Sequence, residues 1–272
     1  MTVQRIDERF AALARAGRAA FVPYVMAGDP DGETAWRILR GLPGAGADLI
    51  ELGIPFSDPM ADGPTIQRAA LRALDGGMTV NGVLELVRRF RAEDDATPIV
   101  LMGYLNPLLS RGYERFAQQA ADAGVDGLIV VDCPPEEADP LADALDAHDL
   151  ALIRLATPTT DAARLEIVAR RTRGFVYYVS VTGVTGVREA DASEIAPMVA
   201  GVRAARGLPV AVGFGIRTPE RAAAVARVAD GVVVGSVLVD QIAEAIAQKR
   251  DPVTKVLESA TALAQAIGSA RG

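Results

Sequence analysis

The chain has 272 residues, half of them hydrophobic, and this length and composition fit a globular α/β protein with a substantial core. Its formal charge of −7 argues against sequence-independent binding to nucleic acid, because that binding needs a basic face. The single cysteine cannot form an internal disulfide, and no apolar run approaches the roughly 20 residues that cross a bilayer, so we expect a cytoplasmic protein without membrane contact.

Residues 2–15 are amphipathic and mixed in charge, which predicts a helix and is unlike a signal peptide. Short apolar runs follow, separated by helix-forming segments such as residues 114–123 and 136–147. The runs lack polar alternation, which is typical of parallel strands buried on both faces. The predicted strands are residues 21–26, 48–53, 99–104, 127–131, 151–155, 175–180, 210–213 and 232–235. Thr218 and Pro219 mark the start of one later helix, and a last helix is expected at residues 252–267.

Eight strand–helix repeats in a chain of this length predict one closed (β/α)8 barrel, a TIM barrel, over residues 1–272. An open doubly wound sheet is the alternative, but it usually has fewer strands and a glycine-rich phosphate fingerprint after the first one. Here AGDPDG follows the first strand, so the sequence favours the barrel. Residues 2–15 would then cover the barrel floor.

Two predicted connections are longer than is usual between such elements. Residues 54–78 follow the second strand and residues 181–192 follow the sixth. Both begin at the carboxyl end of a strand, the face where barrels of this kind hold their active sites. We therefore expect both connections to act as lids over a site.

The residue inventory excludes several mechanisms. Only two of the 28 basic residues are lysines, Lys249 and Lys255, and both lie in the predicted final helices, so a Schiff base on a barrel strand is excluded. One histidine and one cysteine cannot make a zinc site or a serine triad. We interpret His148 as a surface or helix-end residue and Cys133 as a packed thiol, because no histidine base accompanies it.

Carboxylates remain for proton transfer. Glu51 lies within the apolar second strand, where burial would raise its pKa and suit it to general acid/base catalysis. An ion pair with a neighbouring arginine is the structural alternative. Asp62 follows in the sequence ADGP, which is also a turn signal, so a turn residue and a functional acid both remain open for it.

Glycines follow three consecutive predicted strands, as GVTG at 183–186, GFG at 213–215 and GS at 235–236. Glycine lets backbone N–H groups approach an anion closely, and the helix after residue 236 can direct its N-terminus at that anion. The sequence therefore predicts a phosphate site at these strand ends, held without lysine.

Motifs along the whole chain resemble those of the alpha subunit of tryptophan synthase. They are FVPYVMAGDP near the N-terminus, ELGIPFSDPMADGPTIQ after the second strand, VDCPPEE after the fourth, YYVSVTGVTG at the sixth, GFGIRTPE at the seventh and VVGS at the eighth. The second-strand motif is the most specific of these. The resemblance implies a lyase that cleaves indole-3-glycerol phosphate to indole and glyceraldehyde 3-phosphate late in tryptophan biosynthesis, with the indole ring as electron sink.

The resemblance also implies residue roles. Glu51 would protonate ring carbon C3 and assist loss of the glycerol hydroxyl proton, while Asp62 would accept the ring N–H and stabilise the cationic ring. Thr185 would close over the site and position Asp62. The other implied substrate-binding residues are Tyr24, Ile66, Met102, Tyr104, Ile129, Val131 and Tyr177 around the indole, and Gly186, Gly213, Phe214, Gly215, Gly235 and Ser236 around the phosphate.

A partner follows from the same resemblance: a beta subunit that carries pyridoxal phosphate, in an α2β2 heterotetramer. This chain itself would hold no cofactor and no metal, and the loop around Asp58, Asn106–Pro107 and Pro134–Pro135 would meet the partner. Two alternatives remain open, a catalytically idle barrel that only activates the partner and a phosphosugar isomerase. The presence of both Glu51 and Asp62 favours the lyase, and release of indole would distinguish the lyase from both alternatives.

Overall fold

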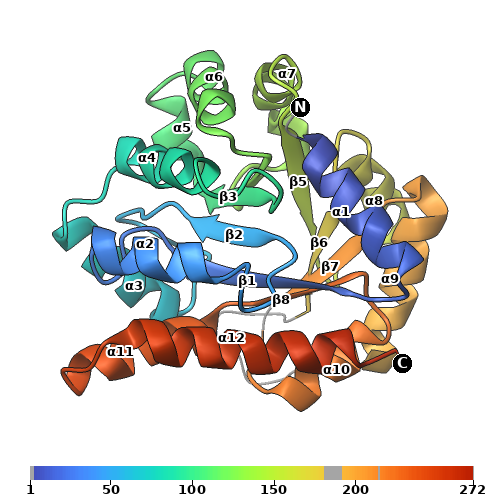
Figure 1. The fold of residues 1–272 in the computed structure, drawn as a ribbon. Coiled ribbons are helices and arrows are strands. Elements are labelled where there is room, and N and C mark those ends of the chain that lie inside the picture. Colours follow the sequence, from blue (N-terminus) through green and yellow to red (C-terminus); the bar gives the residue numbers. More distant parts are fainter. Residues whose placement is uncertain (1–2, 181–191, 214, 272) are drawn as a thin grey trace.

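The strands close into a parallel barrel in chain order, with β8 paired to β1 (Figure 1). The computed structural model describes residues 3–180, 192–213 and 215–271. The strands are β1 (Ala20–Met26), β2 (Ile50–Gly53), β3 (Ile99–Gly103), β4 (Gly127–Val130), β5 (Ala151–Ala156), β6 (Val176–Val179), β7 (Val210–Gly213) and β8 (Gly231–Val234). Each predicted strand lies within two residues of these bounds, so the predicted barrel is confirmed.

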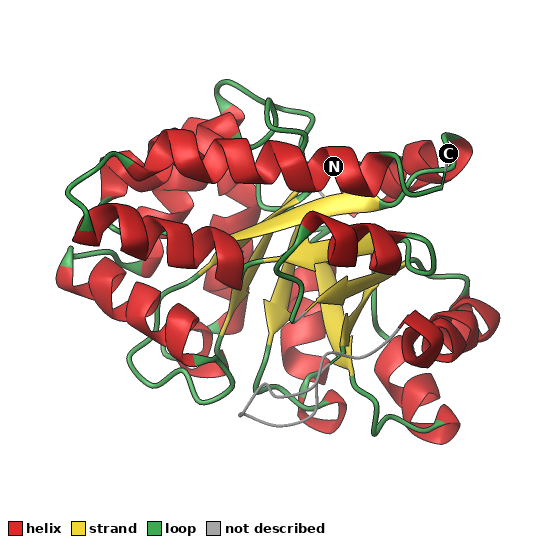
Figure 2. Cartoon of the chain, turned by 90° about the horizontal axis from the view of Figure 1, so that it is seen from below, coloured by secondary structure: helices red, strands yellow, loops and turns green. Residues whose placement is uncertain are grey.

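Helices surround the strands, as Figure 2 shows from a second direction. They are α1 (Val3–Arg15), α2 (Gly32–Gly41), α3 (Pro64–Asp75), α4 (Val80–Arg91), α5 (Leu105–Leu109), α6 (Tyr113–Ala123), α7 (Asp139–Asp146), α8 (Ala162–Ala169), α9 (Ala192–Arg206), α10 (Pro219–Ala226), α11 (Ser236–Ala247) and α12 (Pro252–Gly268), with a 3-10 turn η1 at Pro135–Glu137. Thr218 caps α10 as predicted. The helix predicted over 136–147 divides into η1 and α7, because Pro140 favours a new first turn. No helix in the described part of the chain is long and apolar enough for a membrane span.

The two predicted additional helices are present. The buried residues of α1, including Ile6 and Phe10, pack into the same cluster as the side chains inside the barrel. The ring of Phe10 lies 5.4 Å from that of Phe175, centroid to centroid, so α1 closes the floor. At the other end of the chain, α12 packs along α2, α10 and α11 (Figure 1).

Alternate residues of each strand face the barrel interior, as the pleat of a strand requires. Leu49, Val100 and Ile129 belong to this inner cluster, whereas the neighbouring Ile50 and Leu101 pack outward under the helices. The register pairs Tyr24 of β1 with Glu51 of β2. These two side chains therefore lie at one level on the inner side of the wall.

The predicted connection after β2, residues 54–78, contains a helix, so its part without secondary structure is shorter than expected. Residues 54–63 form a loop, and α3 then begins at Pro64, after Gly63, which provides no side-chain cap. The helix buries Ala69, Ala70 and Ala73 against the barrel. The second predicted lid, residues 181–192, lies almost entirely outside the described residues; only Ala192 is described, as the first residue of α9.

Candidate active site

Glu51 is buried inside the barrel mouth with 2% of its surface exposed. Its Oε1 atom has no hydrogen-bond partner, and the carboxyl makes no ion pair with any described residue, so the described part of the chain does not support the ion-pair alternative. Burial, followed by the nearby charge of Asp62, raises the pKa of Glu51 to about 8. The side chain is therefore protonated at neutral pH and able to donate a proton.

Asp62 lies in the loop between β2 and α3 and is half-buried. Its backbone N–H donates to the carbonyl of Pro59 at 3.1 Å, so the turn that ADGP predicts is present. Burial raises the pKa of its carboxyl to about 6, while a hydrogen bond from Tyr104 acts in the opposite direction. At neutral pH Asp62 is mostly ionised beside a protonated Glu51, and such separated pKa values typically divide acid and charge-stabilising roles between two carboxyl groups.

Tyr104 holds the loop over the mouth. Its hydroxyl accepts a hydrogen bond from the backbone N–H of Ala61 at 3.0 Å and interacts with the carboxylate of Asp62. Phe56, from the same loop, stacks on the Tyr104 ring with centroids 5.3 Å apart and planes 29° apart. These contacts place Asp62 at the mouth from a segment without secondary structure.

A narrow pocket lies at this mouth, and its side chains leave a cavity of only about 10 Å³ in this structure. It combines one carboxylate with aromatic and apolar walls, which suits a small aromatic ligand. Its lining residues are Tyr24, Met26, Ile54, Phe56, Asp62, Ala70, Met102, Gly103, Tyr104 and Val131. Four of the predicted indole-binding residues are among them.

The other predicted indole-binding residues lie close to this pocket. Ile129 and Tyr177 pack inside the barrel with Met102, and Ile66 packs from α3 against the cluster that contains Tyr24. Sequence reasoning missed Met26, Ile54, Phe56, Ala70 and Gly103 as lining residues. The alternation of β1 gave a usable signal for Met26, which is two positions after Tyr24.

Two tyrosine side chains at the mouth pack directly against glycines. A Cβ atom at Gly53 would overlap the hydroxyl of Tyr24, and one at Gly213 would overlap the hydroxyl of Tyr177. Gly213 is thus needed for packing, whether or not it contacts a phosphate. Both tyrosines are buried, and desolvation raises the pKa of each, so the phenols stay neutral.

The N-terminus of α11 offers free donors at the end of β8. Gly235 precedes the helix without a side-chain cap, and its carbonyl accepts from the N–H of Leu238. The first N–H groups of a helix, here those of Ser236 and Val237, have no partner inside the helix. Gly215 is exposed after β7 with φ of 74°. The predicted phosphate residues Gly186 and Phe214, and the predicted lid residue Thr185, lie outside the described residues.

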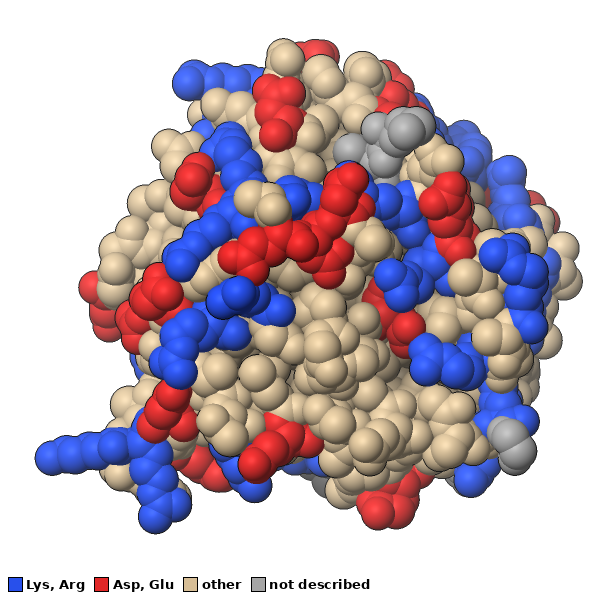
Figure 3. All heavy atoms as spheres, in the orientation of Figure 1, with Lys and Arg blue, Asp and Glu red and all other residues tan. Residues whose placement is uncertain are grey.

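Other chemistry finds no support here. Lys249 follows α11 and Lys255 lies in α12, away from the strands. The described ranges contain no group of three or more acidic, histidine or cysteine side chains placed to hold a metal ion. His148 follows the end of α7, and Cys133 packs half-buried against the core, as predicted. The face in Figure 3 mixes acidic and basic side chains, without the continuous basic area that nucleic acid requires.

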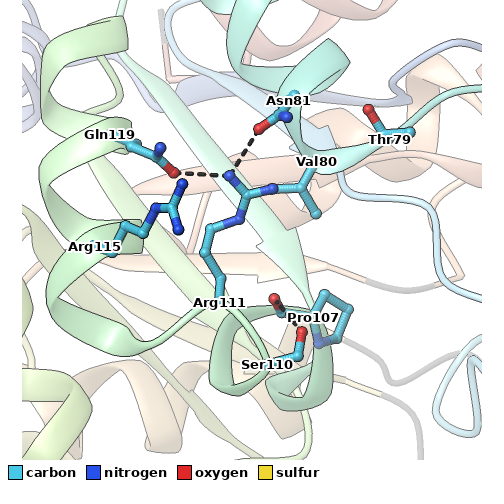
Figure 4. A pocket seen from close by; sticks show the side chains of 8 residues that line it. All are labelled: Thr79, Val80, Asn81, Pro107, Ser110, Arg111, Arg115 and Gln119. Atoms are coloured by element: carbon cyan, nitrogen blue, oxygen red, sulfur yellow. Dashed lines mark hydrogen bonds between the residues drawn. The ribbon is translucent and has the colours of Figure 1, made fainter.

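A second hollow lies in the helix layer, between α4, α5 and α6 (Figure 4). Its volume is about 510 Å³. Arg111 crosses it and donates from one nitrogen to Asn81 and to Gln119, both at 2.7 Å. Neither Glu51 nor Asp62, nor any other acidic residue, lines this hollow, so it is separate from the acid/base site.

A barrel mouth with a protonated buried carboxyl, an ionised neighbour and an aromatic pocket defines a class: acid/base enzymes that act on small aromatic substrates without a protein-bound imine. The family model described as "Tryptophan synthase alpha chain" matches residues 10–268. The chain belongs to this family. It is the lyase that cleaves indole-3-glycerol phosphate in tryptophan biosynthesis, and alpha chains of the family act with a beta chain.

Individual relatives agree with this assignment. The tryptophan synthase alpha chain of Phenylobacterium zucineum is 70% identical over all of this chain and 98% of its own length. That of Caulobacter vibrioides is 68% identical with the same coverage. Among solved structures, subunit alpha from Legionella pneumophila is 44% identical with a TM-score of 0.89, over 97% of this chain and 98% of that one. A chain in the Mycobacterium tuberculosis tryptophan synthase structure is 37% identical with a TM-score of 0.87, again over 97% and 98%.

Proposed function

We propose that Glu51 is the general acid/base of the cleavage. The observation that carries this role is a protonated carboxyl, 2% exposed, with an oxygen that no described group satisfies. Buried polar groups without partners are rare away from functional sites. Glu51 gives its proton to indole C3 and then, as carboxylate, takes the proton of the glycerol hydroxyl while the carbon–carbon bond breaks. The carboxyl ends the step protonated again, so proton and charge balance.

Asp62 is the electrostatic partner in this proposal. Protonation at C3 places positive charge on the ring, and the ring N–H then becomes a stronger donor. The ionised carboxylate of Asp62 accepts that N–H and stabilises the cation, an interaction that is stronger in the transition state than in the ground state. The Tyr104 hydrogen bond supports this role because it lowers the pKa of Asp62 and keeps it charged.

The remaining site residues bind and orient the substrate. We place the indole between Tyr24, Met102 and Tyr104, and the phosphate at the N-terminus of α11 with Gly235 and Ser236. The absence of a side-chain cap on α11 supports this phosphate site. Gly213 and Gly215 complete this cradle in the proposal, whereas Thr185, Gly186 and Phe214 lie outside the described residues.

The assembly is also a proposal. We infer an α2β2 heterotetramer in the cytoplasm, in which residues 1–272 form one catalytic domain and only the beta subunit carries pyridoxal phosphate. Asp58, Asn106–Pro107 and Pro134–Pro135 face the partner. The position of these segments after β2, β3 and β4, at one rim of the mouth, supports a shared interface.

One assay tests the proposal. Purified chain is supplied with indole-3-glycerol phosphate, and release of indole is measured alone and with a beta subunit. We expect slow release that the beta subunit accelerates, and loss of release on Glu51→Gln. Glu51→Gln protein that releases indole at the native rate refutes the assigned role, and a chain that only activates its partner identifies an idle barrel.

A further inference from the structure

Arg154 is a buried arginine to which no carboxylate of the described residues is bonded. It lies on β5 with 6% of its surface exposed. Its Nε atom has no hydrogen-bond partner, and within the described ranges its guanidinium forms no ion pair. Arginine stays charged in proteins, and a buried charge without a partner is strongly unfavourable. A buried guanidinium whose Nε atom has no partner therefore indicates a ligand.

The guanidinium belongs to a pocket at the ends of β4 and β5, lined by residues from both faces of the barrel wall. Ile153 and Leu155 pack inside the barrel, so Arg154 between them points outward. The pocket has a volume of about 320 Å³, with the wall of β4 and β5 on one side and the segment from 132 to 138 on the other. Its lining residues are Val130, Val131, Asp132, Cys133, Pro134, Pro135, Ala138, Leu152, Ile153, Arg154 and Leu155, and it shares only Val131 with the pocket at the mouth.

Acidic side chains near this pocket are already engaged elsewhere. Glu136 is ion-paired with Arg164, and the Nη2 atom of Arg164 donates to the Oε2 atom of Glu136 at 3.1 Å. Asp139 lies 3.6 Å from Arg171. Neither carboxylate is bonded to Arg154; both act on it through their charge at a distance, and its Nε atom remains available to a ligand.

Asp132 lines the same pocket and limits the charge of a ligand. Its Oδ1 atom accepts the backbone N–H of Leu105 at 2.7 Å, which fixes one side of the carboxylate. Because Asp132 already places a negative charge in the pocket, a doubly charged ligand such as a phosphate monoester is disfavoured. The walls are otherwise mostly apolar, with valine, leucine, proline and alanine side chains.

We propose that this pocket binds a small monocarboxylate with an apolar body, whose carboxylate pairs with Arg154. The planar guanidinium matches a carboxylate with two parallel hydrogen bonds. The apolar body fills the space between the barrel wall and the segment from 132 to 138. Arg111 provides the contrast, because Asn81 and Gln119 already satisfy it in its own hollow (Figure 4).

The probe for this site is benzoate, titrated into the full chain with excess indole present so that the mouth pocket is filled. Calorimetry gives the affinity, and thermal unfolding gives the change in Tm. Arg154→Met removes the charge but keeps a long unbranched side chain. Arg154→Lys keeps the charge but lacks the planar guanidinium that forms two parallel hydrogen bonds. Arg170→Gln is the matched control, since Arg170 is a nearby exposed arginine that does not line the pocket.

We expect benzoate to bind the unmodified chain and Arg170→Gln equally and to raise the Tm of both. Binding and the Tm increase should be lost in Arg154→Met and weakened at least tenfold in Arg154→Lys, and inorganic phosphate should bind more weakly than benzoate. Equal benzoate binding by Arg154→Met overturns the proposal. So does a chain that ignores benzoate but loses affinity for the beta subunit on Arg154→Met, because the partner then supplies the carboxylate.

Discussion

Replacing Glu51 with glutamine should slow the enzyme and stabilise the fold at the same time. The kinetic effect is a loss of about 10²- to 10⁴-fold in indole release, typical for removal of a general acid/base group, with substrate binding retained. The stability effect follows from the raised pKa. At neutral pH the folded chain holds a proton on Glu51 that the unfolded chain has released.

The magnitude follows from linkage. Below an ordinary pKa of 4.5 the carboxyl is protonated in both states, and above about 8 it is ionised in both. Between these values the folded state binds more protons, so stability falls as pH rises, by about 1.4 kcal/mol per pH unit. At pH 7 the accumulated cost is about 3 kcal/mol, which glutamine does not carry because it has no proton to lose.

Urea unfolding of both proteins from pH 5 to pH 8 measures this difference. The excess stability of Glu51→Gln should increase steadily over that range and reach about 3 kcal/mol near pH 7. Glu85→Gln is the matched control, because Glu85 is exposed on α4 and pairs with Arg88 one turn further along the same helix. A constant difference between Glu51→Gln and the unmodified chain at every pH would refute a protonated, buried Glu51, even if activity is lost.

Three further predictions concern the mouth. Asp62→Asn should release indole at least ~100-fold more slowly, while Asp62→Glu keeps a measurable rate, since charge survives at a displaced position; equal rates would contradict a charge-stabilising role. Tyr104→Phe removes the hydrogen bond that lowers the pKa of Asp62, so the acid limb of the pH–rate profile should move above pH 6, and an unmoved limb would exclude this coupling. Gly235→Asp should abolish substrate binding in a titration, and Arg217→Ala should bind normally. Gly235→Ala is the steric control, because its added methyl group would lie 3.1 Å from Tyr24 without adding charge. Loss of binding in Arg217→Ala but not in Gly235→Asp would assign the phosphate to arginine.

The strands were predictable because a parallel barrel buries both faces of every strand, which leaves continuous apolar runs in the sequence. The helix α3 was missed for the opposite reason. Its start, Gly63 followed by Pro64, resembles a turn, and its buried face consists of alanines that give little contrast with the exposed face. Glu51 was recognisable because an acid inside an apolar strand is unusual.

Contacts between strands could not be predicted in the same way. The requirement for Gly53 under Tyr24 depends on which residues of β1 and β2 lie side by side, and a single sequence does not contain that register. The same holds for the pairing of Phe56 with Tyr104, which joins a loop to a distant strand end. Arg154 resembles any polar residue in a strand until the engagement of its acidic neighbours is known.

The helix α1 closes the floor of the barrel and leaves the mouth as its open end. Among the described residues, Phe10 and Ile6 fill the floor, so water and hydronium reach Glu51 from the mouth, the side by which the substrate enters. Once the substrate occupies that opening, Glu51 is cut off from bulk solvent for the duration of the reaction. A carboxyl that takes back one proton for each proton it gives needs no such supply.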